Sequence, residues 1–258
     1  SSYQLSTLIP LFFILSTSNK CMQISRYNVF SCKFMIREYI KRWPKLYYLA
    51  LVTIGNVLFV GLSSRKFLDK YKPDGQIVNL GSGPRILRED VINVDITEYE
   101  GVSVVADLTK LPFKDDSVSA IICDNVLEHV EEAKKAVFEI ERILQSGAVA
   151  YISTPFMYPF HSSPYDYHRW SEMGLRHLFK NFEIEEFGVR AGAFSALNAH
   201  LCYLFAIVFS FGSQKLYSIL LDLSLLIFFP IKFLDIFLLP IKQTKYAAAV
   251  YYMVVRKK

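Results

Sequence analysis

The most constraining feature of this chain is a regular alternation of short apolar runs between residues 76 and 153. These runs have the length and the Val and Ile content of β-strands, and the last follows an amphipathic helical pattern. Strands joined by crossover connections form parallel sheets. We therefore expect an α/β domain with a helix at 128–144 and strands at 76–80, 91–94, 102–106, 118–123 and 148–153.

Glycines, carboxylates and amides follow the ends of these expected strands. Because the carboxyl ends of parallel strands meet at one edge of a sheet, these residues should line one site. Glycine permits close approach of the backbone to a ligand, and a carboxylate can accept both hydrogen bonds of a ribose diol. The residues that predict a nucleoside-type cofactor site are Leu80, Gly81, Ser82, Gly83, Asp95, Ile96, Asp107, Leu108, Asp124 and Asn125.

Four segments, taken in order, resemble the class I S-adenosylmethionine-dependent methyltransferases of the Methyltransferase 11 type. The resemblance implies a Rossmann-like sheet of seven strands whose last strand is antiparallel, with S-adenosyl-L-methionine as the cofactor. It covers about half of the chain, from residue 76 to 188 and the final strand. The matching segments are VNLGSG (78–83), NVD (93–95), ADLTKLPFKDDSV (106–118) and IICDNVLEHV (121–130).

The resemblance also implies how the cofactor lies. It would cross the glycine loop, with its ribose on Asp95, its adenine near Asp107 and Leu108, and its methionine end near Asp124 or Asn125.

The glycine loop departs from the usual pattern in its spacing and in the residue that follows it. Asp95 follows Gly83 by only 12 residues, against roughly 20 in a dinucleotide site. Pro84 lacks the backbone donor that would help to bind a pyrophosphate, which argues against a nicotinamide-dependent reductase. A catalytically inactive, methyltransferase-like membrane scaffold stays open as the alternative to an enzyme.

A loop rich in aromatic and titratable residues, 154–170, follows the fifth expected strand. It resembles a P-x-x-x-x-x-H-x-x-P-x-D-Y-x-R loop of methyltransferases in bacterial glycan and lipid pathways. His161 is the candidate general base, with Asp166 to orient it or to replace it. Tyr165 and Arg169 are expected to shape the acceptor pocket, with Arg169 against a phosphate. The alternative is that His161 only binds the backbone of this loop.

Apolar segments flank and interrupt the expected catalytic domain. We expect an apolar and basic helical segment at 1–70, a methyltransferase domain at 71–192 with 241–258, and an apolar helical insertion at 193–240. The uncharged run 46–62 predicts a helix that either spans a membrane or lies in its surface or in a core. Lys215, Asp222, Lys232 and Asp235 interrupt the insertion, which favours immersion in one membrane face. The alternative is a second hydrophobic core covered by the N-terminal segment.

The charge and the cysteines of the chain indicate which partners and ligands to expect. The net charge of +5 is accompanied by no nucleic-acid-binding motif, so we expect no nucleic acid partner. The four cysteines form no cluster with metal-ligand spacing, and no metal site is predicted. The sequence thus predicts a membrane-associated methyltransferase on the cytoplasmic face, acting on a lipid-linked, glycan or other amphipathic acceptor. It does not predict the oligomeric state.

Overall fold

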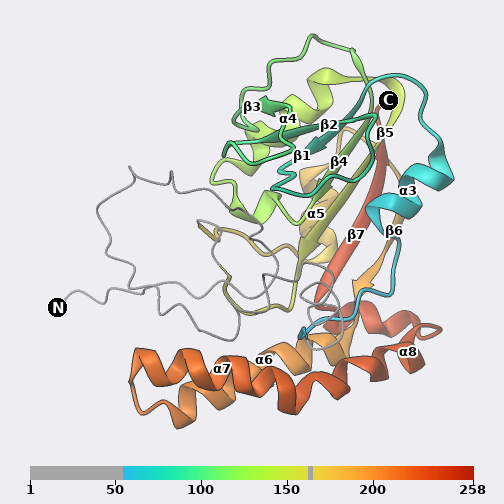
Figure 1. Ribbon diagram of the computed structural model, residues 1–258. Coiled ribbons are helices and arrows are strands. Elements are labelled where there is room, and N and C mark those ends of the chain that lie inside the picture. The colour runs from blue at the N-terminus through green and yellow to red at the C-terminus, as the bar shows by residue number, and fades with distance from the viewer. Residues whose placement is uncertain (1–54, 162–164) are drawn as a thin grey trace.

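A computed structural model of the chain describes residues 55–161 and 165–258 (Figure 1). The order of the elements is α3 (Ser64–Tyr71), β1 (Ile77–Leu80), β2 (Val91–Asp95), β3 (Val104–Val105), β4 (Val118–Asp124), η1 (Leu127–His129), α4 (Ala133–Ile143), β5 (Leu144–Pro155), α5 (Glu172–Leu178), β6 (Glu183–Ala191), α6 (Ala193–Phe209), α7 (Gln214–Phe228), η2 (Phe229–Leu234), α8 (Asp235–Leu238), η3 (Lys242–Ala247) and β7 (Val250–Arg256).

The strands form one seven-stranded sheet in the order β3-β2-β1-β4-β5-β7-β6. Strands β1 to β5 pair in parallel, whereas β7 runs antiparallel to both of its neighbours. The predicted fold class, a Rossmann-like methyltransferase sheet with an antiparallel last strand, is confirmed. The five strands predicted between residues 76 and 153 are all present, although β3 has only two residues and β5 begins at Leu144.

The helix predicted at 128–144 is wrong at its amino end. Residues Leu127–His129 form a single 3₁₀ turn, and α4 begins only at Ala133. Val130 between them is extended, with φ −98° and ψ 117°. The Glu128 carbonyl accepts a hydrogen bond from the Tyr167 amide at 2.8 Å instead of from the next helical turn. A tertiary contact with the 154–170 loop therefore replaces the start of the helix.

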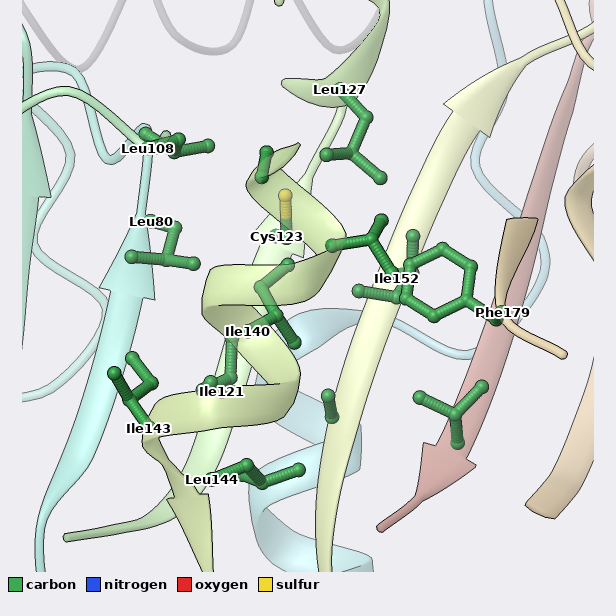
Figure 2. Close-up of a cluster of buried hydrophobic side chains, with 14 of the residues drawn as sticks. Leu80, Leu108, Ile121, Cys123, Leu127, Ile140, Ile143, Leu144, Ile152 and Phe179 are labelled. Carbon is green, nitrogen blue, oxygen red and sulfur yellow. The ribbon is translucent and has the colours of Figure 1, made fainter. Parts of the chain in front are cut away.

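Helices cover both faces of the sheet because alternate side chains of each strand point to opposite sides. On one face, Ile140 and Ile143 of α4 pack over Ile121 and Ile152 (Figure 2). On the other face, Phe67 and its neighbours in α3 pack in a second buried cluster. Helix α3 thus packs on the sheet, although it lies almost entirely before the expected start of the catalytic domain at residue 71.

The insertion between β6 and β7 folds into helices at one end of the sheet, in the layer drawn below the strands in Figure 1. It lies at the carboxyl end of the parallel strands, because Pro155 at the end of β5 pairs with Val250, and Val250 pairs with Ala191, two residues before α6. Among the described residues, no helix combines the length and the apolar character needed to cross a membrane.

Two of the four charges that interrupt the insertion are buried. The Lys232 ammonium donates to the Gly55 carbonyl at 2.6 Å, and Asp235 accepts hydrogen bonds from three backbone amides at the start of α6. Lys232 thus joins η2 to the segment before α3, and Asp235 joins α8 to the start of α6. Lys215 is the one exposed charged side chain in the fully described range 193–241.

The apolar run 46–62 lies mostly outside the described residues. Its described part, 55–62, is not helical: Phe59 forms an isolated antiparallel bridge with Ala191, and the Val60 amide donates to the Arg190 carbonyl at 3.0 Å. The prediction of one helix through residue 62 is therefore wrong, because this end of the run pairs with the edge strand β6.

Candidate functional site

The glycine loop after β1 takes a backbone conformation that favours glycine. Gly81 has a φ of +63° and Gly83 a φ of +55°, in the left-handed region that most side chains avoid. A Cβ at Gly81 would also lie 2.5 Å from the Cγ atoms of Val126, which follows β4. The Ser82 amide donates to the Val94 carbonyl at 3.1 Å, so the loop is fixed on β2 as well.

Asp95 contacts the glycine loop directly. Its Oδ2 accepts a hydrogen bond from the Gly83 amide at 2.8 Å, and its Oδ1 accepts one from the Thr97 amide at 2.9 Å. The unusually short connection between the two residues therefore still brings the carboxylate to the loop. Ile96, the next predicted residue, is exposed beside it.

Asp107 and Leu108 lie at the end of the neighbouring edge strand. The Asp107 carboxylate accepts from the Thr109 amide at 2.7 Å and from the Thr109 hydroxyl at 2.8 Å, while Leu108 is buried. The Ala106 amide donates to the Asp95 carbonyl at 3.0 Å, which ties this turn to the end of β2. The adenine side of the predicted site is thus built on a rigid turn.

Asp124 ends the central strand β4 next to the glycine loop. Its carboxylate accepts from the Ser153 hydroxyl at 2.5 Å and from the Asn125 amide side chain at 3.3 Å. The guanidinium of Arg85, which sequence reasoning missed, lies 3.8 Å from it. A small hollow of about 20 Å³ is lined by Gly81, Arg85, Asp124 and their neighbours. Asn125 has a φ of +57°, which turns the chain sharply after the strand.

Three candidate residues of the 154–170 loop, His161, Asp166 and Arg169, form a hydrogen-bonded cluster around Arg169. Arg169 forms a salt bridge with Asp166 and donates to the carbonyls of Tyr158, Pro159 and His168. These bonds already use its guanidinium within the loop, which leaves no free edge for a phosphate. The Asp166 carboxylate also accepts from the His161 amide at 2.8 Å.

Asp166 is almost fully buried, and its ionisation follows from its partners. Burial by itself would raise the pKa of this carboxyl. The hydrogen bonds from Arg169 and from the His161 amide outweigh it, so the pKa lies below its ordinary value. Asp166 is consequently a carboxylate that orients its neighbours. Its other predicted role, as a general base in place of His161, is disfavoured because a lowered pKa makes the carboxylate a weaker base.

His161 does more than bind the backbone of its loop. Its Nδ1 lies 3.4 Å from the Pro159 carbonyl, while its Nε2 faces the buried Glu128 carboxylate at 3.8 Å. Tyr165, in contrast, is exposed, and its carbonyl oxygen lies 2.5 Å from Nδ1 of His129. The 154–170 loop therefore docks on the segment that directly follows Asp124, at the same edge of the sheet as the glycine loop.

An apolar hollow of about 490 Å³ lies beside this loop. Pro159 lines it from the loop side, and Leu197, Leu201 and Leu204 line it from α6. The Tyr203 hydroxyl donates to the Phe160 carbonyl at 3.2 Å and connects the two walls. The insertion thus contributes an apolar wall next to the candidate residues of the 154–170 loop.

Comparison with known proteins supports the resemblance. Residues 81–152 match a family described as methyltransferase domain. An uncharacterized methyltransferase from Mycolicibacterium vanbaalenii is 33% identical over 110 residues, which is 43% of this chain and 40% of that protein. The match therefore spans less than half of the relative's length.

Solved structures are similar at lower identity. Geranyl diphosphate C-methyltransferase from Streptomyces coelicolor, solved with S-adenosyl-L-homocysteine, is 11% identical, with a TM-score of 0.47 over 75% of this chain and 77% of that chain. A putative methyltransferase from Bacillus halodurans is 15% identical, with a TM-score of 0.47 over 76% of this chain and 99% of that chain. Such likenesses concern the fold and give no information on the acceptor.

The sheet order and the glycine-and-carboxylate edge define a Rossmann-like methyltransferase fold. Residues 81–152, which form the centre of this sheet, match the family described as methyltransferase domain. The predicted resemblance is thus supported over residues 81–152. S-adenosyl-L-methionine is the cofactor that this resemblance implies.

Proposed function

We propose that the chain is an S-adenosylmethionine-dependent methyltransferase that works at a membrane surface on an acceptor with a long apolar part. The observation that carries the enzymatic proposal is the hydrogen bond of 2.8 Å between the Gly83 amide and Asp95. It joins the glycine bend to a carboxylate that keeps lone pairs for a ribose diol. A nucleoside cofactor without a pyrophosphate fits a loop in which Pro84 has no amide donor.

The cofactor would lie along the carboxyl ends of β1, β2 and β4. Asp95 would hold the ribose, the turn at Asp107 and Leu108 would border the adenine, and Asp124 would face the methionine ammonium group. Opposite charge favours that last contact. Arg85, which now lies 3.8 Å from Asp124, would move away from the carboxylate when the ammonium binds; its side chain is half exposed and free to do so.

Methyl transfer from a sulfonium needs mainly alignment of the nucleophile, the methyl carbon and the sulfur. The docked 154–170 loop supplies the acceptor side of that alignment. Asp166 and Arg169 are positioning residues, because their charges are used to hold the loop. His161 is the residue through which we expect the nucleophile of the acceptor to be activated, since its Nε2 is turned away from the backbone and toward Glu128.

The apolar hollow beside the loop supports an amphipathic acceptor. Its walls would take a hydrocarbon chain while the polar end reaches His161, and they consist of apolar side chains apart from His200 and the Tyr203 hydroxyl. Residues of α6 form most of the lining of the hollow, so the same helix would border both the acceptor and the lipid. A lipid-linked molecule could then enter from the membrane without crossing water.

The helices of the insertion support membrane contact. The insertion exposes Phe211, at 88%, in the turn between α6 and α7, and Phe237, at 73%, in α8, among many other large apolar side chains. An apolar surface of this extent with Lys215 as its one exposed charge between residues 193 and 241 is typical of an interaction site rather than of a surface in water. We assign it to a membrane surface on the cytoplasmic side, where the cofactor is available, with the helices lying in the interface.

The direct test is transfer of a labelled methyl group. The full chain would be incubated with S-adenosylmethionine labelled in the methyl group and with membrane lipid extract. We expect label in an organic-solvent-extractable product, and a loss of at least tenfold in the Asp95→Ala variant but not in Asp90→Ala, an exposed carboxylate outside the site. Label that remains in the aqueous phase with every extract would contradict the lipid acceptor.

A further inference from the structure

The carboxylate of Glu128 is buried without a hydrogen-bond partner. Its side chain is 0% exposed, and neither carboxyl oxygen accepts a hydrogen bond in the described structure. Burial of a carboxylate without compensation costs several kcal/mol or more, so such groups are paired or bind a metal. The position of Glu128, directly after the strand that ends at Asp124, places this carboxylate at the edge of the site.

Two histidine rings face this carboxylate. Nε2 of His129 and Nε2 of His161 each lie 3.8 Å from Oε1 of Glu128, too far for a hydrogen bond. One potential ligand atom from each of the three residues lies within 4.8 Å of the others. Four bonds of about 2.05 Å to a tetrahedral zinc ion would place ligand atoms roughly 3.4 Å apart. The two histidine–carboxylate distances therefore need to shorten by about 0.4 Å, and no pair of ligand atoms needs to close by more than about 1.4 Å.

The tautomer of His129 leaves Nε2 free to coordinate. Its Nδ1 lies 2.5 Å from the carbonyl oxygen of Tyr165. A carbonyl oxygen only accepts hydrogen bonds, so the proton of the neutral ring is on Nδ1 and the lone pair is on Nε2. A hydrogen bond from the second ring nitrogen to a carbonyl is the usual way in which proteins orient a metal-binding histidine.

His161 has two acceptors for an Nδ1 proton. The Pro159 carbonyl lies 3.4 Å away and the Asp166 carboxylate 3.6 Å away. Arg169 Nη2 is also 3.2 Å from Nδ1 and would donate to it in the other tautomer. A metal ion on Nε2 selects the tautomer with the proton on Nδ1, which the ionised Asp166 stabilises. Asp166, itself held by Arg169, then orients the His161 ring as a metal ligand.

We propose that Glu128, His129 and His161 bind one divalent transition-metal ion, with Zn²⁺ as the best match. Two imidazoles and a carboxylate form a ligand set found in catalytic zinc sites, whereas Mg²⁺ and Ca²⁺ prefer oxygen ligands. The histidine side chains are 13% and 18% exposed, so a further ligand can approach the ion from the acceptor side. Metal binding stands independently of the proposed function, and only its role rests on it. With Nε2 of His161 bound to the ion, His161 would activate the acceptor through the metal, which would hold an acceptor oxygen as a Lewis acid.

The metal competes with a simpler arrangement in which the two histidines alone pair with Glu128. Both arrangements satisfy the buried carboxylate, but only the first leaves an ion on the protein. Sequence reasoning predicted no metal site, because His161 is far from Glu128 and His129 in the chain and meets them only when the loop docks.

The experiment is elemental analysis and Co²⁺ spectroscopy of the full chain. The purified protein would be dialysed against Zn²⁺ and then against metal-free buffer, and bound metal measured for wild type, Glu128→Gln, His161→Ala and the control His177→Ala, an exposed histidine of α5. Circular dichroism would verify that each variant is folded. Substitution with Co²⁺ gives visible absorption that reports a coordinated site.

We expect about one zinc ion per chain in wild type and in His177→Ala, and at least a tenfold weaker affinity in both other variants. A zinc content that none of the substitutions changes would overturn the proposal, as would wild type without bound metal. Binding of S-adenosyl-L-homocysteine, measured in parallel, shows separately whether the cofactor site is intact.

Discussion

Asp235 accepts a hydrogen bond from the Ser195 backbone amide at 3.0 Å across forty residues of sequence. The same buried carboxylate accepts from the amides of Gly192 and Phe194, so it caps the start of α6 from the far side of the insertion. A carboxylate at a helix amino end is stabilised by unpaired amides and by the helix dipole. The insertion is thereby fixed to the end of β6.

Removal of this cap should destabilise the insertion. We expect Asp235→Ala to lower the free energy of unfolding by about 2 to 3 kcal/mol, because three buried amides lose their acceptor. Lys215→Ala, at an exposed site of the same insertion, should change it by less than about 0.5 kcal/mol. Urea unfolding followed by circular dichroism measures both. Equal effects of the two substitutions would contradict the capping role.

A side chain at Gly81 should disturb the cofactor loop. Gly81→Ala combines a φ of +63° with a Cβ 2.5 Å from Val126, and we expect it to destabilise the fold and to weaken cofactor binding by at least tenfold. Gly147→Ala is the matched control, since Gly147 has a φ of +77° but open space around it. That control should cost only about 1 kcal/mol of stability and leave cofactor affinity unchanged. Equal cofactor affinity in the two variants would contradict the role of Gly81 in the loop.

Lys232 predicts a specific dependence of stability on pH. Burial lowers its pKa from 10.5 to about 8, so the folded chain releases this proton first as pH rises. Between pH 8 and pH 10.5 the unfolded chain binds more protons than the folded chain. The free energy of unfolding therefore rises as the pH increases. Wild type should therefore gain stability relative to Lys232→Met between pH 8 and 10.5, by no more than about 3 kcal/mol. Parallel stability curves for the two proteins would show that the ammonium is not desolvated.

The apolar face of the insertion should govern membrane binding. We expect the full chain to sediment with vesicles of phosphatidylcholine and phosphatidylglycerol, and the double variant Phe211→Ser/Phe237→Ser to partition at least about tenfold less, since each phenylalanine contributes roughly 1.5 to 3 kcal/mol when buried. Phe138→Ser, at a 65% exposed position of α4, is the control and should sediment like wild type.

Two results would contradict the membrane assignment. Full partition of the double variant would mean that the apolar face does not contact lipid. Failure of wild type to sediment, together with a concentration-dependent shift in its sedimentation velocity that the double variant lacks, would mean that a second copy of the chain covers this face.

The five parallel strands were predictable because each carries a local apolar pattern, whereas the antiparallel last strand was expected only from the resemblance to methyltransferases. The meeting of Gly81, Asp95 and Asp124 at one edge of the sheet was predictable from the same patterns, because Gly81 follows β1 and the two aspartates end β2 and β4. The cluster of Glu128 and His161 was not, since it depends on how a long loop docks. Burial of charges is likewise a tertiary property.

The start of α4 and the charges of the insertion illustrate that limit. The apolar periodicity from residue 128 onward is helical, but the carbonyl of Glu128 binds the Tyr167 amide instead. Lys232 and Asp235 interrupt an apolar sequence, yet each is buried with a backbone partner. Sequence patterns report the average environment of a segment and not the particular partner that a polar group finds.

Calorimetric titration of the full chain with S-adenosyl-L-methionine tests the central claim most directly. We predict binding of one cofactor per chain, with affinity weakened by roughly 1 to 3 kcal/mol in Asp95→Ala, because charged hydrogen bonds to the ribose are lost. Asp90→Ala should bind like wild type. Absence of binding to the folded wild-type chain would contradict the account and would favour a methyltransferase-like scaffold without catalytic activity.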